Sequence, residues 1–231
     1  AAINNRFQWI HVHMDFNYWY THIGLELHPL VAGFLSRNLE FVEEDESTTT
    51  PFATYRSWTE FSHYFTYRAQ LTPNGDISEL AYDLATGFVS QTAAQALKTH
   101  IQLQSKFNFL KILQTKTIDR INMNDAINQV LFANIVRYID FANPKHVENF
   151  TSLLKEKATE QKYANLVSNC ILELKNLMKF CASKNDTDKV DKIKSMLADL
   201  TKNKSVLSRI EPLISSRSSM YAEKEGVLID V

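Results

Sequence analysis

The chain has 231 residues, enough to bury a substantial core as one large domain or two small ones. Apolar residues make up 45% and charged residues 22%, a balance that is ordinary for folded proteins and excludes wholesale disorder. The net charge of −1 provides no overall field to attract nucleic acid or an anionic membrane, and there is no apolar run of about 18 residues that would predict a transmembrane helix.

Glycine is depleted. The chain has 5 glycines, whereas average usage of about 7% would give roughly 16. Few glycines means few positions that favour a positive φ, and therefore few tight hairpin turns and few loops that cradle phosphate. The depletion favours helices joined by short polar loops, and it disfavours nucleotide-binding folds built on glycine motifs.

The first part of the chain combines histidines with aromatic residues. The segment FQWIHVHMDFNYWYTHIGLELHP, residues 7–29, holds four of the seven histidines and two of the three tryptophans. Residues 7–14 alternate in a way that would suit a strand, which is the best evidence for a strand in the chain. Pro29 then suits the first turn of a helix, and apolar residues follow helical spacing as far as Val42.

Polar segments punctuate the next part of the chain. Residues 43–51, EEDESTTTP, have no apolar side chain and predict an exposed acidic loop. A helix beginning near Pro51 would align aromatic residues along a broad stripe. The turn sequence TPNGD leads to Asp76, which is predicted to cap another helix.

The helix that follows Asp76 is predicted to be interrupted at Gly87 or Ser90. The next run is predicted to continue without a break to Leu113. Asn124 is predicted to cap a helix that extends to Tyr138.

The last third of the chain predicts three further helices. Asn143 and Pro144 suit the cap and the first position of the first helix. Two more helices, carrying apolar residues from 163 to 181 and from 190 to 200, are separated by SKNDTD at residues 183–188. A short helix is predicted near residues 206–210, and the remainder has no periodicity.

These patterns predict an all-α fold, an irregular bundle of about seven to nine helices. Three regions are expected: an aromatic-rich helical N-terminal region at 1–142, a lysine-rich antiparallel helical bundle at 143–212, and an extended tail at 213–231. Residues 1–70 contain 15 of the 26 aromatic residues. Residues 141–231 carry 15 basic and 12 acidic side chains, and the remainder of the chain carries 10 and 14.

The histidine cluster is the only local concentration of metal-ligand side chains, and it defines a minority hypothesis of a metal-binding protein or metal-dependent enzyme. A zinc or iron site needs three or four ligands that converge at about 2.0–2.2 Å. The spacing His-x-x-x-His, which achieves this on helices, is absent from the chain, and Glu-x-x-His occurs once, at Glu60–His63, without the second copy that a di-iron bundle requires. We therefore expect no metal or other cofactor. The minority hypothesis would use His11, His13, His22 and His28.

Other chemistries find less support. There is no Gly-x-Ser-x-Gly motif and no phosphate-binding glycine loop. Cys170 and Cys181, placed on one helix, would lie about 16 Å apart along its axis, too far for a disulfide. Buried free thiols in a reducing intracellular compartment are expected. The C-terminal lysines alternate with acids, so nucleic-acid binding is only a third hypothesis.

The aromatic residues carry the principal hypothesis. They occupy almost every register of FNYWY and YRSWTEFSHYFTY, so no single helix face can bury all of them. Trp, Tyr and Arg are enriched at the centres of protein interfaces, and Trp and Tyr also suit contact with a membrane surface. The predicted interface residues are Trp9, Phe16, Tyr18, Trp19, Tyr20, Tyr55, Trp58, Tyr64 and Tyr67.

The sequence therefore predicts a non-enzymatic structural or accessory subunit of a larger multiprotein assembly, whose partners are other protein subunits. Docking is expected through the aromatic N-terminal part. A mitochondrial complex is one expected home, because the start at Ala1 fits a processed end, and the cytoplasm is the alternative.

Overall fold

The fold is all-α, as the sequence predicted. The computed structural model describes residues 15–44, 51–72, 76–118 and 122–202, together with the single positions Ser208 and Pro212. Two predicted segments lie outside the described residues: the strand at 7–14 and the tail at 213–231. Of the short helix predicted near 206–210, only Ser208 is described. None of the helices in the described ranges is long and apolar enough to cross a membrane.

Ten α-helices, several of only two turns, form in these ranges. Their bounds are α1 Phe16–His22, α2 Pro29–Leu35, α3 Tyr55–Leu71, α4 Ile77–Ala85, α5 Gln91–Gln104, α6 Phe109–Thr115, α7 Ala126–Phe132, α8 Pro144–Ala158, α9 Ala164–Ser183 and α10 Thr187–Thr201. Short 3-10 segments lie between them: η1 Gly24–Glu26, η2 Leu39–Phe41, η3 Ala133–Tyr138 and η4 Gln161–Tyr163.

Side-chain caps explain where many helices begin. Asp76 accepts hydrogen bonds from the backbone N–H groups of Ser78 and Glu79, and Asn143 accepts one from Lys145 ahead of Pro144, as the sequence predicted. Each such bond satisfies a backbone donor that the first turn leaves without a partner. Asp125, rather than the predicted Asn124, caps α7.

The predicted continuous run to Leu113 was wrong. Helix α5 ends at Gln104, and α6 begins at Phe109 with the Asn108 side chain accepting from the N–H of Lys111. At this break the chain passes from one hydrophobic cluster of the core, which ends at Ile101, to a second cluster, which begins at Phe107. Apolar spacing alone did not reveal it, because both helices present apolar residues.

Buried residues form two hydrophobic clusters. The first contains residues between Phe16 and Ile101, and the second contains residues between Phe107 and Leu200. We call residues 15–104 the N-terminal half and residues 107–202 the C-terminal half. The division of the core therefore falls at the α5–α6 break, while the change in composition at residue 142 falls inside the second cluster.

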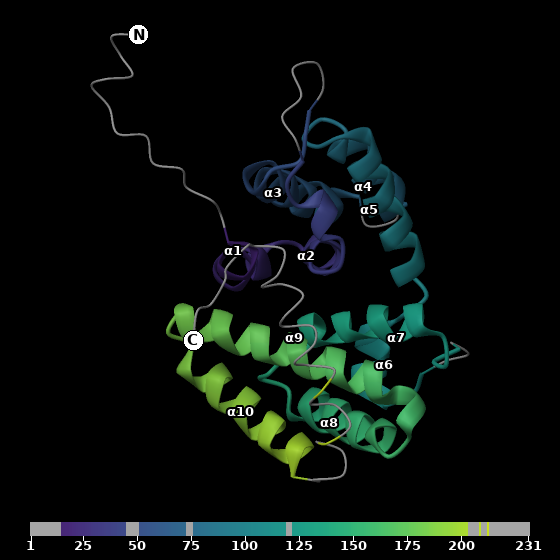
Figure 1. Cartoon of the computed structure of the whole chain (residues 1–231), viewed down its shortest axis with the longest axis vertical. Helices are drawn as coiled ribbons and strands as arrows, with labels where there is room; N and C mark the ends of the chain where they lie inside the picture. The colour runs from purple at the N-terminus through teal and green to yellow at the C-terminus, as the bar shows by residue number, and fades with distance from the viewer. Residues whose placement is uncertain are drawn as a thin grey trace.

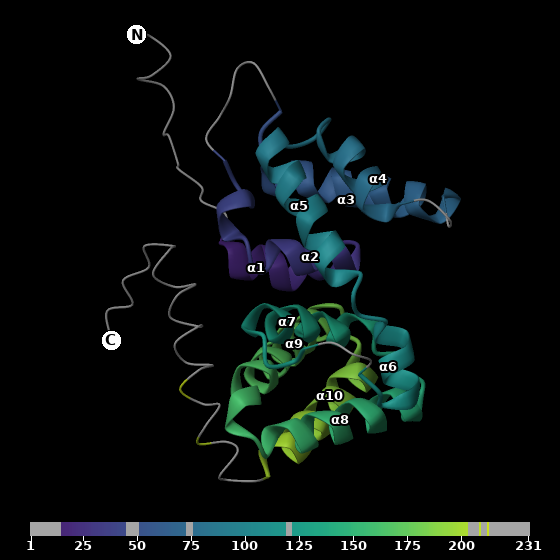
Figure 2. The same ribbon diagram turned by 90° about the vertical axis from the view of Figure 1, so that its right-hand side faces the viewer.

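The helices are arranged in layers. Figure 1 shows α3–α5 at one end of the molecule and α6–α10 at the other. Figure 2 shows α1 and α2 in the layer between them, with α1 above α9. Helices α8, α9 and α10 pack on one another and form the C-terminal bundle.

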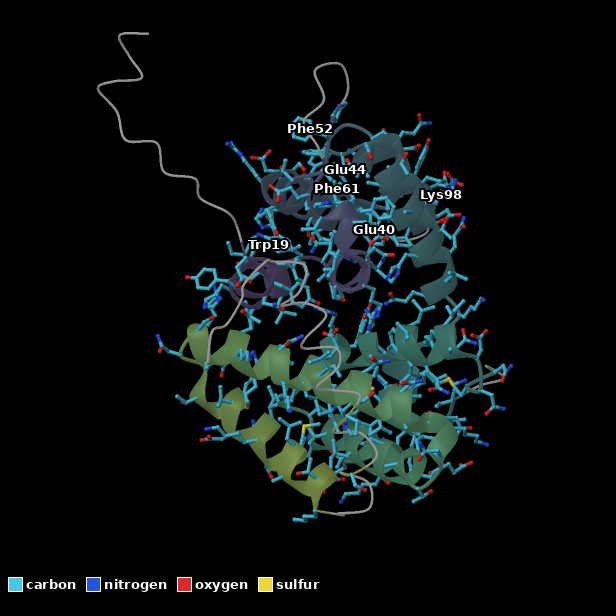
Figure 3. All side chains as sticks on the ribbon, viewed as in Figure 1. Trp19, Glu40, Glu44, Phe52, Phe61 and Lys98 are labelled. Carbon is cyan, nitrogen blue, oxygen red and sulfur yellow. The ribbon has the colours of Figure 1, made fainter. Side chains whose placement is uncertain are left out.

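The N-terminal half is tied together at its outer edges as well as in its core. Figure 3 shows Phe61 in the interior of this half and Lys98 on the outer side of α5. The Lys98 Nζ lies 2.6 Å from a carboxylate oxygen of Glu79 and 5.2 Å from the ring centre of Tyr82, so it links α5 to α4.

A second tie involves Glu44, which is also labelled in Figure 3. Its backbone N–H donates to the Ala53 carbonyl at 2.9 Å, and its carboxylate accepts from the Ala53 N–H at 2.8 Å. The other carboxylate oxygen accepts from the Ser90 hydroxyl at 2.6 Å. Glu44 thus joins the two backbone positions that flank residues 45–52, its own and that of Ala53, and holds them against Ser90 at the start of α5.

Candidate functional site

The predicted interface aromatics divide into core residues and surface residues. Trp9 lies outside the described residues. The side chains of Phe16, Trp19, Tyr20 and Trp58 are buried within the chain, and Tyr55 is half-buried. Tyr18, Tyr64 and Tyr67 are exposed, with 62%, 45% and 59% of their surface accessible. Among the members of the set that the structure describes, these three alone have side chains that reach solvent freely.

Helix α3 explains this division for the residues after Thr54. Trp58, Phe61 and Phe65 follow helical spacing and are fully buried on its inner face. The Trp58 indole Nε1 donates to the Phe41 carbonyl at 2.6 Å, which satisfies its polar group inside the core. Trp58 as a docking residue is therefore corrected: its ring belongs to the chain's own core.

Helix α1 buries its aromatics in the same way. Phe16 stacks on Tyr20 with ring centres 5.3 Å apart, and Trp19 packs edge-on against Tyr55 at 5.0 Å. The Tyr20 hydroxyl donates to the Ala32 carbonyl at 3.3 Å. Because these rings fix α1 against α2 and α3, the prediction that they face a partner is corrected as well.

The outer face of α3 carries an apolar stripe. Tyr64, Tyr67 and Leu71 follow the i, i+3, i+7 spacing of one helix face, and Leu71 is 59% exposed. We call these three residues the α3 stripe. Figure 2 shows that the end of α3, together with α4, extends sideways beyond the helices of the layers beneath it. The stripe therefore lies on an accessible part of the N-terminal half.

Tyr18 belongs to a smaller exposed group on α1. Its ring stacks on that of His22 at 4.1 Å, and Ile23 beside them is 40% exposed. The His22 Nδ1 lies 2.7 Å from the Tyr18 carbonyl oxygen, a bond in which the imidazole donates. His22 is thereby held against its own helix.

A network of polar side chains joins the two halves, and we call it the polar joint: Tyr20, Arg37, Gln104, Asn134, Arg137 and Glu173. Glu173 on α9 lies 3.0 Å from the Arg137 Nη2 and 3.9 Å from the Arg37 Nη2. The Arg137 guanidinium also donates to the Tyr20 hydroxyl and lies over the Tyr20 ring. These charges are almost fully buried, a cost that pairing and hydrogen bonding offset.

Asn134 continues the joint. It accepts from the Arg37 Nη1 at 2.6 Å and donates to the Gln104 Oε1 at 2.7 Å. Gly33 makes this approach possible, because a Cβ at that position would lie 2.6 Å from the Asn134 Nδ2. No motif in the sequence predicted the joint. Its signal was Glu173, a charged residue in the same helical register as Cys170 and Leu177.

Described residues line three cavities at the junction of the halves. One of about 200 Å³ is lined by Leu27 from one half and Arg137, Glu173 and Leu177 from the other. A second of about 530 Å³ lies between α2, α5 and α7, and a third of about 330 Å³ lies beside the α5–α6 break. Junctions between packed units are a common location for ligand sites.

Two of the described histidines, His28 and His100, lie inside the fold. The His28 Nδ1 accepts from the Leu30 N–H and caps α2, and burial lowers its pKa to about 4. Burial, with a smaller effect of the Arg37 charge, also lowers the pKa of His100 to about 4. Within the described residues, no three histidine, cysteine or acidic side chains are placed to hold a metal ion. His11 and His13 lie outside this part, so the four-histidine site stays a prediction.

The C-terminal lysines are interleaved with acids in space as well as in sequence. Lys155 pairs with Asp199 at 2.5 Å, and Lys192 pairs with Asp188 at 2.7 Å. Lys184 pairs with Glu26 of the N-terminal half at 2.5 Å. These pairs reduce the positive charge that the bundle could present to a phosphate backbone.

No protein-family model, no curated protein and no solved structure matches this chain.

Proposed function

We propose that this protein is a non-enzymatic structural or accessory subunit of a larger protein assembly, and that it docks on other subunits through the α3 stripe. The observation that carries the proposal is the exposure of Tyr64, Tyr67 and Leu71 along one face of a projecting helix. The partners are other protein chains. The mitochondrial location stays a prediction from sequence.

The rigidity of α3 supports the proposal. The helix has 17 residues, and its inner face is held by Trp58, Phe61 and Phe65, each fully buried. A partner would therefore meet side chains whose backbone is already fixed, so that little backbone entropy is lost on binding. Tyrosine has few rotatable bonds, and it combines a large apolar area with a hydroxyl that tolerates water.

The chemistry of the stripe supports a protein partner over a nucleic acid. Stacking of bases on aromatic residues is usually combined with a basic groove that follows the backbone. The charged residues of α3 include Arg56, which pairs with Glu60 at 2.8 Å, and the exposed Arg68 beside the stripe. A partner with an apolar groove that admits tyrosine rings would complement this surface better.

The test is native affinity purification with mass spectrometry, using the wild-type chain and the double variant Tyr64→Ser/Tyr67→Ser. The proposal predicts partner proteins that co-purify with the wild type in stoichiometric amounts and are lost from the variant. Tyr18→Ser is the matched control, because it removes an equally exposed tyrosine from another helix. Partners retained by the double variant, or a free monomer in native extract, would contradict the proposal.

Metal analysis distinguishes the competing hypothesis, a metal-binding protein, from the subunit proposal. Zinc or iron bound in a 1:1 ratio, and lost on substitution of His11 and His13, would favour a metal-binding protein. The same measurement on a His22→Asn variant distinguishes a four-histidine site from a site confined to the first two histidines.

A further inference from the structure

The smallest of the three junction cavities combines apolar walls with a buried cation. Its apolar lining comes from both halves: Leu25, Leu27, Pro29, Val136, Ile139, Phe141, Leu177 and Phe180. The charged side chains on its wall are Arg137, Glu173 and Lys189. A ligand in this cavity would contact the N-terminal half and the C-terminal half at once.

The cavity volume limits the ligand to a small molecule. An apolar cavity of about 150 Å³ is large enough to take up benzene. At about 200 Å³, this cavity has room for a six-membered ring with one small substituent. A long acyl chain or a nucleotide would exceed the space.

Arg137 provides the polar anchor. Its side chain is 6% exposed, and its Nη2 is occupied by Glu173 and by the Tyr20 hydroxyl. Its Nε is buried and has no hydrogen-bond partner among the described residues. A buried cationic donor without an acceptor is costly, so an acceptor delivered by a ligand would recover a charge-assisted hydrogen bond.

We propose that this cavity binds a small apolar monocarboxylate, with the carboxylate on the Arg137 guanidinium and the apolar body between Leu27 and Leu177. The proposal is independent of docking through the α3 stripe. It assigns a small-molecule site at the junction, where a ligand would hold the two halves together.

The surrounding charges are compatible with an anionic head group. Glu173 is the only carboxylate on the described cavity wall, and it faces both Arg37 and Arg137. The Lys189 ammonium also lies on the wall and pairs with Asp186 at 3.0 Å. The repulsion between a ligand carboxylate and Glu173 is therefore opposed by several cations. Two or more carboxylates on the ligand would add repulsion without adding a second buried donor.

The first test compares benzoate with benzamide, its neutral analogue of the same shape, by isothermal titration calorimetry on the full chain. The proposal predicts saturable 1:1 binding of benzoate with a dissociation constant on the order of 0.1 mM. Benzamide should bind at least about tenfold more weakly, because it lacks the charge that Arg137 would meet. Equal binding of the two compounds, or no saturable binding of benzoate, would overturn the proposal.

The second test places the ligand in the cavity. Leu177→Trp adds volume from the half-buried rim and should abolish benzoate binding while the helical circular dichroism spectrum is retained. Arg137→Gln should weaken benzoate at least about tenfold and leave benzamide unchanged. Arg56→Gln is the matched control, since it removes an exposed arginine on α3 and should leave both affinities as they are.

The third test needs no substitution and covers the case in which Arg137→Gln does not fold. The arginine Nε–Hε resonances of the unaltered protein are followed by nuclear magnetic resonance as benzoate is added. The Arg137 signal should shift in a saturable manner with the calorimetric affinity, and the Arg56 signal should not move. A shift confined to exposed arginines would show nonspecific anion binding and would overturn the assignment.

Discussion

The guanidinium of Arg37 donates to the side chain of Asn134 at 2.6 Å, although the two residues are 97 positions apart in the chain. The bond crosses from the turn after α2 in the N-terminal half to η3 in the C-terminal half. The two hydrophobic clusters are thus joined here by oriented polar contacts, which require defined geometry, as well as by apolar packing. The stability of the joint can be tested separately from the stability of either cluster.

Gly33→Ala should destabilise the protein by about 1–3 kcal/mol, even though alanine favours helices. The added Cβ would lie 2.6 Å from the Asn134 Nδ2, and Asn134 is fully buried and cannot move without losing its bonds to Arg37 and Gln104. Urea unfolding followed by circular dichroism measures the loss.

Gly87→Ala is the control for this substitution. The nearest atom to its added Cβ is the Leu84 carbonyl oxygen at 3.5 Å, an ordinary contact. Its unfolding free energy should stay the same or rise by about 0.5 kcal/mol. Equal losses at both glycines would show that crowding of Asn134 is not the cause.

Glu173→Gln should cost about 3–5 kcal/mol, because it removes the carboxylate that faces two largely buried arginines. The Arg137 and Glu173 side chains are 6% and 9% exposed. Thermal unfolding measures the effect. Glu60→Gln removes the carboxylate of the exposed pair with Arg56 and should leave the unfolding midpoint within error of the wild type. A wild-type midpoint for Glu173→Gln would show that the buried charges do not need their partner.

Stability should decrease as the pH falls from about 6.5 to about 4. The pKa values of His28 and His100 are lowered from 6.5 to about 4, so the unfolded chain binds protons in this range before the folded protein does. The contribution is fully present above pH 6.5. At about 1.4 kcal/mol per pH unit, a shift from 6.5 to about 4 contributes at most about 3.4 kcal/mol for each residue.

Urea midpoints between pH 4 and pH 7.5 measure this dependence. His28→Asn keeps an acceptor at the cap of α2 but removes the titrating group, so it should flatten the profile without abolishing the helix. An unchanged profile in a His28→Asn/His100→Gln double variant would assign the dependence to other groups.

The two cysteines should resist alkylation in the folded protein. Both are free and buried, at 0% and 3% exposure for Cys170 and Cys181, and burial raises the pKa of each thiol. The thiolate needed for reaction with iodoacetamide is therefore scarce at pH 8.

Mass spectrometry of partly alkylated protein should show Cys181 modified before Cys170. Cys181 lies two residues before the end of α9 at Ser183, where the helix opens more readily than at its centre. Modification of both at one rate would indicate that the whole of α9 opens together.

Local signals predicted most helix starts. Asp76 and the pair Asn143–Pro144 were predicted from side-chain chemistry that acts within one helical turn, and the structure confirms both caps. The α5–α6 break was missed because Ser105 and Asn108 lie between two apolar runs that share a plausible helical register. A break of this kind depends on the two clusters of the core, which the local pattern does not specify.

The aromatic residues show a second limit on what the sequence can predict, namely which side chains of a helix are exposed. Helix α3 has aromatic side chains on its inner and outer faces, so its sequence predicted exposure of some of them without deciding which. Burial of Trp58 and exposure of Tyr67 follow from where α2 and α4 pack against α3. The polar joint could not be predicted from local patterns, because Arg37, Asn134 and Glu173 are far apart in the sequence and meet only in the folded chain.

The hydrogen bonds between Glu44 and Ala53 have a practical consequence for the laboratory. Glu44 and Ala53, which flank residues 45–52, are hydrogen-bonded to each other, and Glu44 is also bonded to Ser90. Residues inserted between Glu44 and Ala53 would therefore cost mainly the entropy of closing a longer loop, about 0.6 kcal/mol for each doubling of its length. An epitope tag inserted between Glu44 and Ala53 would therefore lengthen a segment whose two ends these hydrogen bonds already hold together.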